Sequence, residues 1–505
     1  MRRLFNKAKN AIWLIIDGCH AETFKNLYRS GNLPNLRRAM GDALFVEQAA
    51  SVFPSVTLVC LSSLATGCWP RTHGIVNNVW LDRSLEPFGG RAYLSELDQT
   101  LACFDRKLYG LPTGLLPDLN TGGMLNNDID PETKTIFEVL GEAGLTSYAV
   151  FNYVGRGATI WRRPGRGDMA HYAEIDKRSH NYSRWDRLMI DAAMKLTVKN
   201  GLPNLLNLYF GGHDGQSHHR GVGAQSDYLR RVVDLQMGRL FNQLQKKYKL
   251  TDLYMIVSAD HGQTGFPRAG AHRPLWTGQI VPMLRDTGPG VVVDGGEKSE
   301  IDPSANVAFA IGNGAALFIY IKNRETGSWR HAPRMEEDIL PVAHAVLRAA
   351  DPACADRPSY IGPFLDALLV RPAPDQPYAV YTGPAQDGAA GGFITTLERF
   401  AFARDRYPDA PALIAGIEHA HRGPDIVAIL DYDRGGWYFS DSDHLGNHGS
   451  FTIEDIAVPL AFSGPDIAPG SLPSARIIDI APTIASMFER EMPSADGEAL
   501  DIFSA

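Results

Sequence analysis

The chain has 505 residues, of which 44% are hydrophobic, 10% aromatic and 21% charged. This composition is typical of a globular protein and excludes disordered, collagen-like and coiled-coil chains, while the length allows one large domain with an insertion or about two to three domains. The formal net charge of -8 provides no overall basic field, so we expect no obligate nucleic-acid partner.

The N-terminal segment combines a basic start with a short apolar run, residues 11–16. Asp17 ends this run after 6 residues, whereas the apolar part of a signal peptide needs about seven to fifteen. No run approaches the roughly 20 apolar residues that span a bilayer. The cysteines are sparse, odd in number and without CxxC spacing, which argues against disulfides and thiolate metal sites. They are Cys19, Cys60, Cys68, Cys103 and Cys354. We therefore predict a cytoplasmic protein with no membrane partner.

Four short apolar runs, each followed by a turn and by helical periodicity, indicate βα units and a parallel sheet. They cover residues 11–16, 147–151, 205–210 and 253–258. Ligands bind at the carboxyl ends of the strands in such sheets. Three of the four runs end close to Asp or His residues, so we expect the functional site at this edge of the sheet.

The pattern changes in two places along the chain. Residues 81–127 are rich in Gly, Pro and Asp with weak periodicity, which predicts loops over the active-site face. Residues 265–440 contain Gly- and Pro-rich turns between separate strand-like runs, which predicts an inserted α+β cap domain that sets specificity. The core catalytic domain then comprises residues 1–264 and 441–505.

The C-terminal part of the predicted core contains one more strand and a helix. The apolar run of residues 457–462 includes Pro459, which predicts an edge position because proline cannot donate a ladder hydrogen bond. Residues 477–487 read as a closing helix that begins near Pro482.

Two motifs after strand-like runs carry metal-ligating side chains. Asp214 and His218 are four apart, so on a helical turn both would share one face and could hold one metal. Asp260 and His261 are adjacent and can reach the same metal only if the chain turns there. Gly262 permits such a turn.

Other candidates are weaker alone. Asp17 follows the first run, where a helix N-cap is the alternative role. His448 lies in a glycine-containing loop, and the nearby His444 is an alternative ligand. Thr57 could offer its hydroxyl at a helix start, where the helix dipole favours a phosphate, although an N-cap is again the simpler reading.

Taken in chain order, these residues resemble the metal centre of the alkaline phosphatase superfamily, closest to its type I phosphodiesterase/nucleotide pyrophosphatase branch. Supporting sequences are Leu33-Pro34-Asn35-Leu36, Thr66-Gly67, His73-Gly74-Ile75 and Asp479-Ile480-Ala481-Pro482-Thr483. The resemblance implies an α/β fold with an alkaline-phosphatase-like core, a central mostly parallel sheet flanked by helices. It covers nearly the whole chain except the insertions.

The resemblance also implies roles for individual residues. One divalent ion would be held by Asp214, His218 and His448, and the other by Asp17, Thr57, Asp260 and His261. Zinc is the expected metal, with manganese and iron as alternatives. Thr57 would be the nucleophile that forms a phosphothreonine intermediate. Asn78 would donate a hydrogen bond to the phosphate, with Asn77 as the alternative donor.

The resemblance favours a hydrolase that cleaves phosphodiester or phosphoanhydride bonds of a small molecule. Two departures put nucleotide specificity in doubt: Leu58-Val59-Cys60-Leu61 stands where the family commonly has Phe-Pro-Asn-His, and Phe451-Thr452 where it has Asp-Asn.

Several alternatives to this reading stay open. They are a phosphonoacetate-hydrolase-like enzyme that cleaves C–P bonds, a phosphomonoesterase, and a metal-binding module without turnover. A phosphoglycerate-type mutase would use a serine nucleophile and several arginines, and a sulfatase would need a Cys or Ser motif at Thr57. In the insertion, Lys322, Arg330 and Arg334 are candidate contacts for a carboxylate or second phosphate, or simply solvated cations. The sequence does not indicate which oligomeric state the protein has.

Overall fold

A computed structural model gives the structure of the chain. It describes residues 9–84, 89–92, 124–165, 168, 171–172, 174–265, 279–286, 291–294, 305–311, 316–384, 392–401, 403–431 and 444–503. Most of the predicted insertion at residues 81–127 therefore lies outside the described residues. Its described ends form β3 (Val79–Asp82), β4 (Gly89–Ala92) and α6 (Met124–Asp128).

The predicted parallel sheet is the centre of the fold. Its order is β18-β2-β19-β8-β1-β7-β5-β6, and β20 pairs with β2. The strands are β1 (Ala11–Ile16), β2 (Leu44–Ala50), β5 (Ser147–Val150), β6 (Ile160–Arg162), β7 (Leu205–Phe210), β8 (Tyr254–Ser258), β18 (Ala457–Val458), β19 (Leu460–Ser463) and β20 (Gly470–Arg476). From β8 to β6 all pairs are parallel. β1 lies between β7 and β8, so the residues that follow these three strands meet at one edge.

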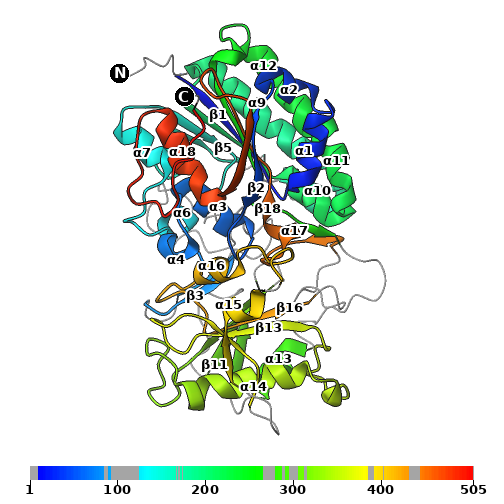
Figure 1. Cartoon of the computed structure of the whole chain (residues 1–505), viewed down its shortest axis with the longest axis vertical. Helices are drawn as coiled ribbons and strands as arrows, with labels where there is room; N and C mark the ends of the chain where they lie inside the picture. The colour runs from blue at the N-terminus through cyan, green and yellow to red at the C-terminus, as the bar shows by residue number, and fades with distance from the viewer. Residues whose placement is uncertain are drawn as a thin grey trace.

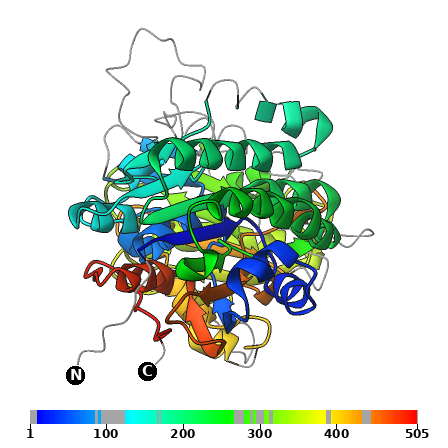
Figure 2. The same cartoon turned by 90° about the horizontal axis from the view of Figure 1, so that it is seen from above.

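Helices cover both faces of this sheet (Figures 1 and 2). One layer contains α1 (Ala21–Arg29), α2 (Pro34–Met40), α9 (Ser183–Asn200), α11 (Gln225–Tyr228) and α12 (Asp234–Leu244). The other contains α3 (Thr57–Thr66), α7 (Ile136–Glu142) and α18 (Ile480–Met487). The start of α7 is fixed by a capping box between Thr135 and Glu138, which satisfies backbone donors that have no partner within the helix.

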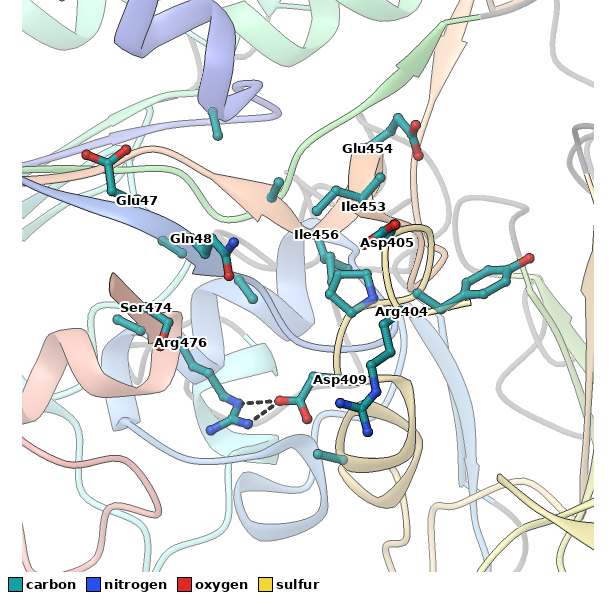
Figure 3. Close-up of a pocket in the computed structure, with 18 of the residues that line it drawn as sticks. Glu47, Gln48, Arg404, Asp405, Asp409, Ile453, Glu454, Ile456, Ser474 and Arg476 are labelled. Carbon is teal, nitrogen blue, oxygen red and sulfur yellow. Dashed lines mark hydrogen bonds and ion pairs between the residues drawn. The ribbon is translucent and has the colours of Figure 1, made fainter. Parts of the chain in front are cut away.

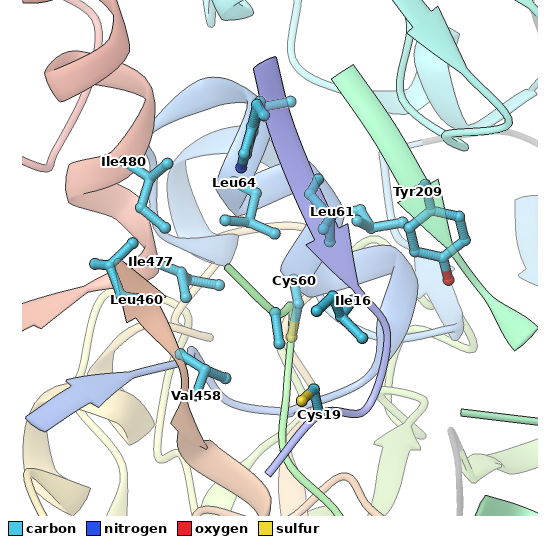
Figure 4. Packing of buried hydrophobic residues seen from close by; sticks show 14 of the residues in the cluster. Ile16, Cys19, Cys60, Leu61, Leu64, Tyr209, Val458, Leu460, Ile477 and Ile480 are labelled. Carbon is cyan, nitrogen blue, oxygen red and sulfur yellow. The ribbon is translucent and has the colours of Figure 1, made fainter. Parts of the chain in front are cut away.

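Buried residues of α3 pack against the central sheet. All ten residues of α3 are buried, and Cys60, Leu61 and Leu64 face Ile16 of β1 and Leu460 of β19 (Figure 4). Residues 58–61, which depart from the family pattern, are each fully buried. They therefore form part of the hydrophobic core.

The prediction that Pro459 marks an edge strand is wrong. β19 lies inside the sheet, between β2 and β8. Ala457 pairs with Ala50, whereas Ala461 pairs with Phe45, so the two strands advance by unequal numbers of residues around Pro459. This irregularity separates β18 from β19 and accommodates a residue that cannot donate a ladder hydrogen bond.

A second sheet occupies the other end of the molecule (Figure 1). Its order is β10-β11-β12-β16-β13-β14-β15. The strands are β10 (Val291–Asp294), β11 (Ala305–Ile311), β12 (Ala316–Ile321), β13 (Leu365–Val370), β14 (Ala379–Tyr381), β15 (Phe393–Thr395) and β16 (Ile426–Leu430). Helices α13 (Val281–Arg285) and α14 (Leu340–Ala349) pack with this sheet in one hydrophobic cluster, separate from the main core. All these elements fall within residues 265–440, but the limits of an inserted domain stay a prediction.

Among the described residues, no helix is both long and apolar enough to cross a membrane. Four of the five cysteines, Cys19, Cys60, Cys68 and Cys354, are free thiols, and Cys103 lies outside the described residues.

Candidate metal centre and nucleophile

Three buried side chains meet at the carboxyl ends of β1 and β8. Asp17 directly follows β1, and Asp260 and His261 follow β8. His261 Nε2 lies 3.3 Å from Asp17 Oδ1 and 3.5 Å from Asp260 Oδ2. We call these three residues the carboxylate half-site, and they form one of two groups of described residues that could hold a metal ion.

The second group follows β7 and is carried largely by α10 (Gly212–Arg220). As the four-residue spacing predicts, Asp214 and His218 share one helix face, with 3.0 Å between Asp214 Oδ2 and His218 Nε2. His448 completes the group, with Nε2 3.7 Å from Asp214 Oδ1. We call these three residues the imidazole half-site.

The two half-sites touch each other. The rings of His261 and His448 stack with centroids 3.6 Å apart and planes 14° apart. The two groups therefore form one centre, in which two cations would be neighbours.

The hydrogen bonds of the three imidazoles fix the nitrogen that faces the centre. His218, His261 and His448 each place Nδ1 at 2.7–2.8 Å from a backbone carbonyl, those of Gly446, Gly262 and Ser55 respectively. A carbonyl only accepts, so each Nδ1 carries the proton and donates it. Nε2 of each ring then faces the carboxylates and, once it has lost any proton, can offer its lone pair to a metal ion, as a metal-ligating histidine does.

The carboxylate half-site carries unbalanced negative charge. Burial, followed by the charges of Asp260 and Asp214, raises the pKa of Asp17 well above its usual range, and burial also raises the pKa of Asp260. Among the described residues, Asp17 Oδ1 and Asp260 Oδ2 are buried without a hydrogen-bond partner. Two orphaned carboxylate oxygens beside an imidazole lone pair fit a divalent cation.

The imidazole half-site differs in its charge balance. Burial raises the pKa of Asp214, but the adjacent His218 more than offsets this and leaves the pKa below its usual range. Burial lowers the pKa of His448 well below its ordinary value, which keeps this ring neutral. Neutral imidazoles and an ionised carboxylate are a ligand set that suits zinc.

Thr57 is the first residue of α3, and its hydroxyl faces the centre. Thr57 Oγ1 lies 3.2 Å from His261 Nε2. Val56, not Thr57, occupies the N-cap position, and no side chain caps this helix. The hydroxyl is therefore available at a helix N-terminus, where the helix dipole stabilises an incoming anion.

The structure places the other candidates less decisively. Asn78 is buried just before β3, and its backbone N–H donates to Asn77 Oδ1 at 2.8 Å; its role in phosphate binding stays a prediction. The ring of His444 is tilted by 39° against that of His218, with centroids 4.4 Å apart, whereas His448 belongs to a group that could hold a metal ion. Two of the candidate cations of residues 265–440 have partners within that segment. Arg334 forms an ion pair with Asp338, with Nε 3.1 Å from Oδ2. Lys322 Nζ lies 5.5 Å from the centre of the Trp329 ring.

Two hydrogen-bond partners of the candidate metal-ligating carboxylates were not predicted. The Tyr209 hydroxyl donates to Asp17 Oδ2, and Gln263 Nε2 donates to Asp214 Oδ1 at 3.0 Å. Tyr209 sits on β7 and Gln263 follows the Asp260-His261 motif. Proximity to the strand ends was the only signal in the sequence that could have indicated them.

Two glycines shape the centre in different ways. Gly18 has φ +62°, and a Cβ there would lie 2.6 Å from Asp214 Oδ1, so any side chain would collide with the site. Gly262 is not among the described residues with positive φ. A Cβ at Gly262 would lie 2.2 Å from the Glu454 carbonyl oxygen, so this glycine is needed for close backbone approach.

The chain matches the profile of one protein family. The profile of the family described as "Type I phosphodiesterase / nucleotide pyrophosphatase" matches residues 11–359. A comparison with curated protein sequences finds no match.

Similar solved structures include murine ectonucleotide pyrophosphatase/phosphodiesterase 5, with a TM-score of 0.59 and 15% identity, and an inactive variant of it in complex with AMP, with a TM-score of 0.58 and 15% identity. The human counterpart has a TM-score of 0.55 and 16% identity. Each match covers 98% of this chain and 100% of the other, and at this identity it shows the fold, that of alkaline phosphatase. Since the family profile spans well over half of the sequence, the chain belongs to the type I phosphodiesterase/nucleotide pyrophosphatase family of hydrolases.

Proposed function

We propose that this hydrolase cleaves phosphodiester or phosphoanhydride bonds of small molecules with two divalent metal ions, most simply zinc, and with Thr57 as the nucleophile. One observation carries the proposal: Thr57 Oγ1 lies at the N-terminus of α3, 3.2 Å from a nitrogen of the carboxylate half-site. A nucleophile, an anion-binding helix end and a metal-ligating cluster therefore meet at one point.

The proposed reaction has two steps. Thr57 Oγ1 attacks phosphorus and loses its proton, the bond to the leaving oxygen breaks, and a phosphothreonine forms; water then hydrolyses it and regenerates the hydroxyl. When bound, two such cations stabilise the attacking and leaving oxygens of an in-line displacement and lower the pKa of the attacking hydroxyl and water. Since Thr57 contacts the carboxylate half-site, the leaving oxygen would depart on the side of the imidazole half-site. Asn78 would donate to a non-bridging phosphate oxygen.

The nucleophile can be tested by conservative replacement. Thr57→Ala should lower kcat by roughly four to six orders of magnitude, whereas Thr57→Ser should keep measurable activity because it retains a hydroxyl. After rapid quenching, mass spectrometry should find the phosphoryl adduct on the Thr57 peptide of the parent enzyme. Unchanged turnover by Thr57→Ala would eliminate the proposed mechanism and revive the reading of a metal-binding module.

The substrate class needs a direct comparison of kcat/KM. The panel contains bis-aryl phosphodiesters, nucleoside triphosphates, aryl monoesters and phosphonoacetate. We expect diesters or anhydrides to be preferred, because no described arginine is seen to contact the centre and a doubly charged monoester would need more positive charge. Preference for phosphonoacetate would identify a C–P hydrolase, the enzymatic alternative.

The AMP complex described for the relative supports nucleotides as one class to include in the screen. The proposed cytoplasmic location is supported by the sparse cysteines, four of which are free. Its test is the redox state and distribution of the protein in fractionated cells.

A further inference from the structure

Asp455 is a fully buried carboxylate that has no place in the proposed reaction. It belongs to α17 (Ile453–Ile456), a short helix beside the metal centre. Its neighbours Ile453 and Glu454 line a pocket of about 1140 Å³ (Figure 3). Asp455 does not line this pocket and has no exposed surface.

The hydrogen bonds of Asp455 reach both metal-ligand loops. On the side of the carboxylate half-site, Asp455 Oδ1 accepts from Thr264 Oγ1 at 2.6 Å, and its backbone carbonyl accepts from Gly262 N at 2.7 Å. On the side of the imidazole half-site, Asp455 Oδ2 accepts from Ser450 N at 3.0 Å and from Ser450 Oγ at 2.7 Å. One side chain therefore holds the loop that follows His261 and the loop that follows His448.

Ser55 continues this network to the nucleophile. Its hydroxyl donates to the Ser450 carbonyl at 2.6 Å and accepts from Gly449 N at 3.1 Å. Its own carbonyl accepts from His448 Nδ1. Since Ser55 lies two residues before Thr57, the hydrogen bonds run without interruption from the nucleophile loop through the His448 loop to Asp455.

We infer that Asp455 is a positioning residue that couples the two half-sites by fixing the loop after His261 to the loop after His448. The inference rests on the proposed metal centre. Outer partners that orient metal ligands typically contribute about 10- to 100-fold to metal affinity. Because Asp455 holds both loops, its loss should weaken both ions, whereas loss of one of its donors should weaken one ion.

The first test is titration of the metal-free full chain with Zn²⁺ against a competing chelator, which gives two dissociation constants. Asp455→Ala should raise both by about 10- to 100-fold, and Asp455→Asn should raise them less because it keeps one acceptor. Thr264→Val should weaken the carboxylate half-site only, and Ser450→Ala the imidazole half-site only. Unchanged constants in Asp455→Ala, or a change in one alone, would overturn the inference.

Two control variants separate positioning from general stability. Glu454→Gln changes the adjacent residue of α17, which faces the pocket (Figure 3). Asp234→Asn changes another buried carboxylate, 1% exposed, whose oxygens accept from Asn35 and Leu36 backbone N–H groups between α12 and α2. Asp234→Asn should lower the melting temperature while leaving both metal dissociation constants unchanged, and Glu454→Gln should change neither.

A second test does not depend on metal. Amide hydrogen exchange of the metal-free protein should be faster over residues 260–264 and 446–452 in Asp455→Asn and Asp455→Ala, and unchanged there in Asp234→Asn. If the parent chain binds no metal, the proposed function fails, while faster exchange in both segments would still support the coupling by Asp455. Faster exchange in one segment alone would contradict it.

Discussion

The two half-sites are similar in ligand number but opposite in charge balance. The carboxylate half-site has two carboxylates with raised pKa values and one imidazole. The imidazole half-site has one carboxylate with a lowered pKa and two imidazoles. Without metal, the first contains like charges that repel, whereas the second contains an Asp214–His218 pair that stabilises itself. A cation is therefore needed most in the carboxylate half-site, which Thr57 contacts.

Removal of metal should have the largest effect. Prolonged dialysis against a chelator should reduce hydrolysis to background, and addition of Zn²⁺ should restore it. The melting temperature should rise on restoration, since ligands that bind the native state stabilise it by about 2.7 kcal/mol at 100 times their Kd. A chelated protein, shown to be metal-free by elemental analysis, that retains full turnover would refute the metal centre.

Matched Asp-to-Asn variants in the two half-sites should change the free energy of unfolding in opposite directions. In the metal-free protein, Asp260→Asn should raise the free energy of unfolding because it removes like-charge repulsion, and its Oδ1 can still accept from Gly18 N and His261 N. Asp214→Asn should lower it by roughly 3 kcal/mol because it breaks a buried pair with His218.

Both Asp-to-Asn variants should bind metal more weakly than the parent, and denaturant unfolding with and without Zn²⁺ provides the comparison. The same sign of stability change for the two metal-free proteins would contradict the difference in charge balance.

The outer partners of each half-site should have smaller, local effects. Tyr209→Phe removes the donor to Asp17, and Gln263→Leu removes the donor to Asp214. Each should weaken one ion by about tenfold, which the two-site Zn²⁺ titration resolves. Weakening of the opposite ion would show that the partners are wrongly assigned.

Asp186, which lies beside the start of α10, should make the free energy of unfolding depend slightly on pH. Asp186 accepts from Gly212 N, at the start of α10, and from the Tyr228 hydroxyl, and burial raises its pKa to about 7. The folded state then holds a proton that the unfolded state has already lost, so the parent loses stability as pH rises toward this pKa and through it.

Asp186→Asn is neutral at every pH, like the protonated acid, and should therefore not lose stability as the pH rises. Relative to the parent, its free energy of unfolding should increase by about 1.4 kcal/mol between pH 6 and pH 8. Urea unfolding at the two pH values measures the difference, and a constant difference would argue against the raised pKa of Asp186.

Much of the fold and the spatial grouping of the candidate ligands could be predicted from the sequence. Asp17, Asp214 and Asp260 each follow an apolar run, and parallel strands bring such ends together. The outer hydrogen bonds could not be predicted, because Asp455 and Tyr209 act through contacts between segments far apart in the chain. Pro459 was misplaced since a local irregularity in pairing cannot be recognised from one strand alone.

The most direct test of the two-ion centre is an anomalous difference map from crystals of the Zn²⁺-reconstituted protein, collected at the zinc absorption edge. We expect two peaks roughly 4 Å apart, one among Asp17, Asp260 and His261 with Thr57 beside it, the other among Asp214, His218 and His448. A single peak, or peaks away from these side chains, would contradict a two-ion centre formed by these residues.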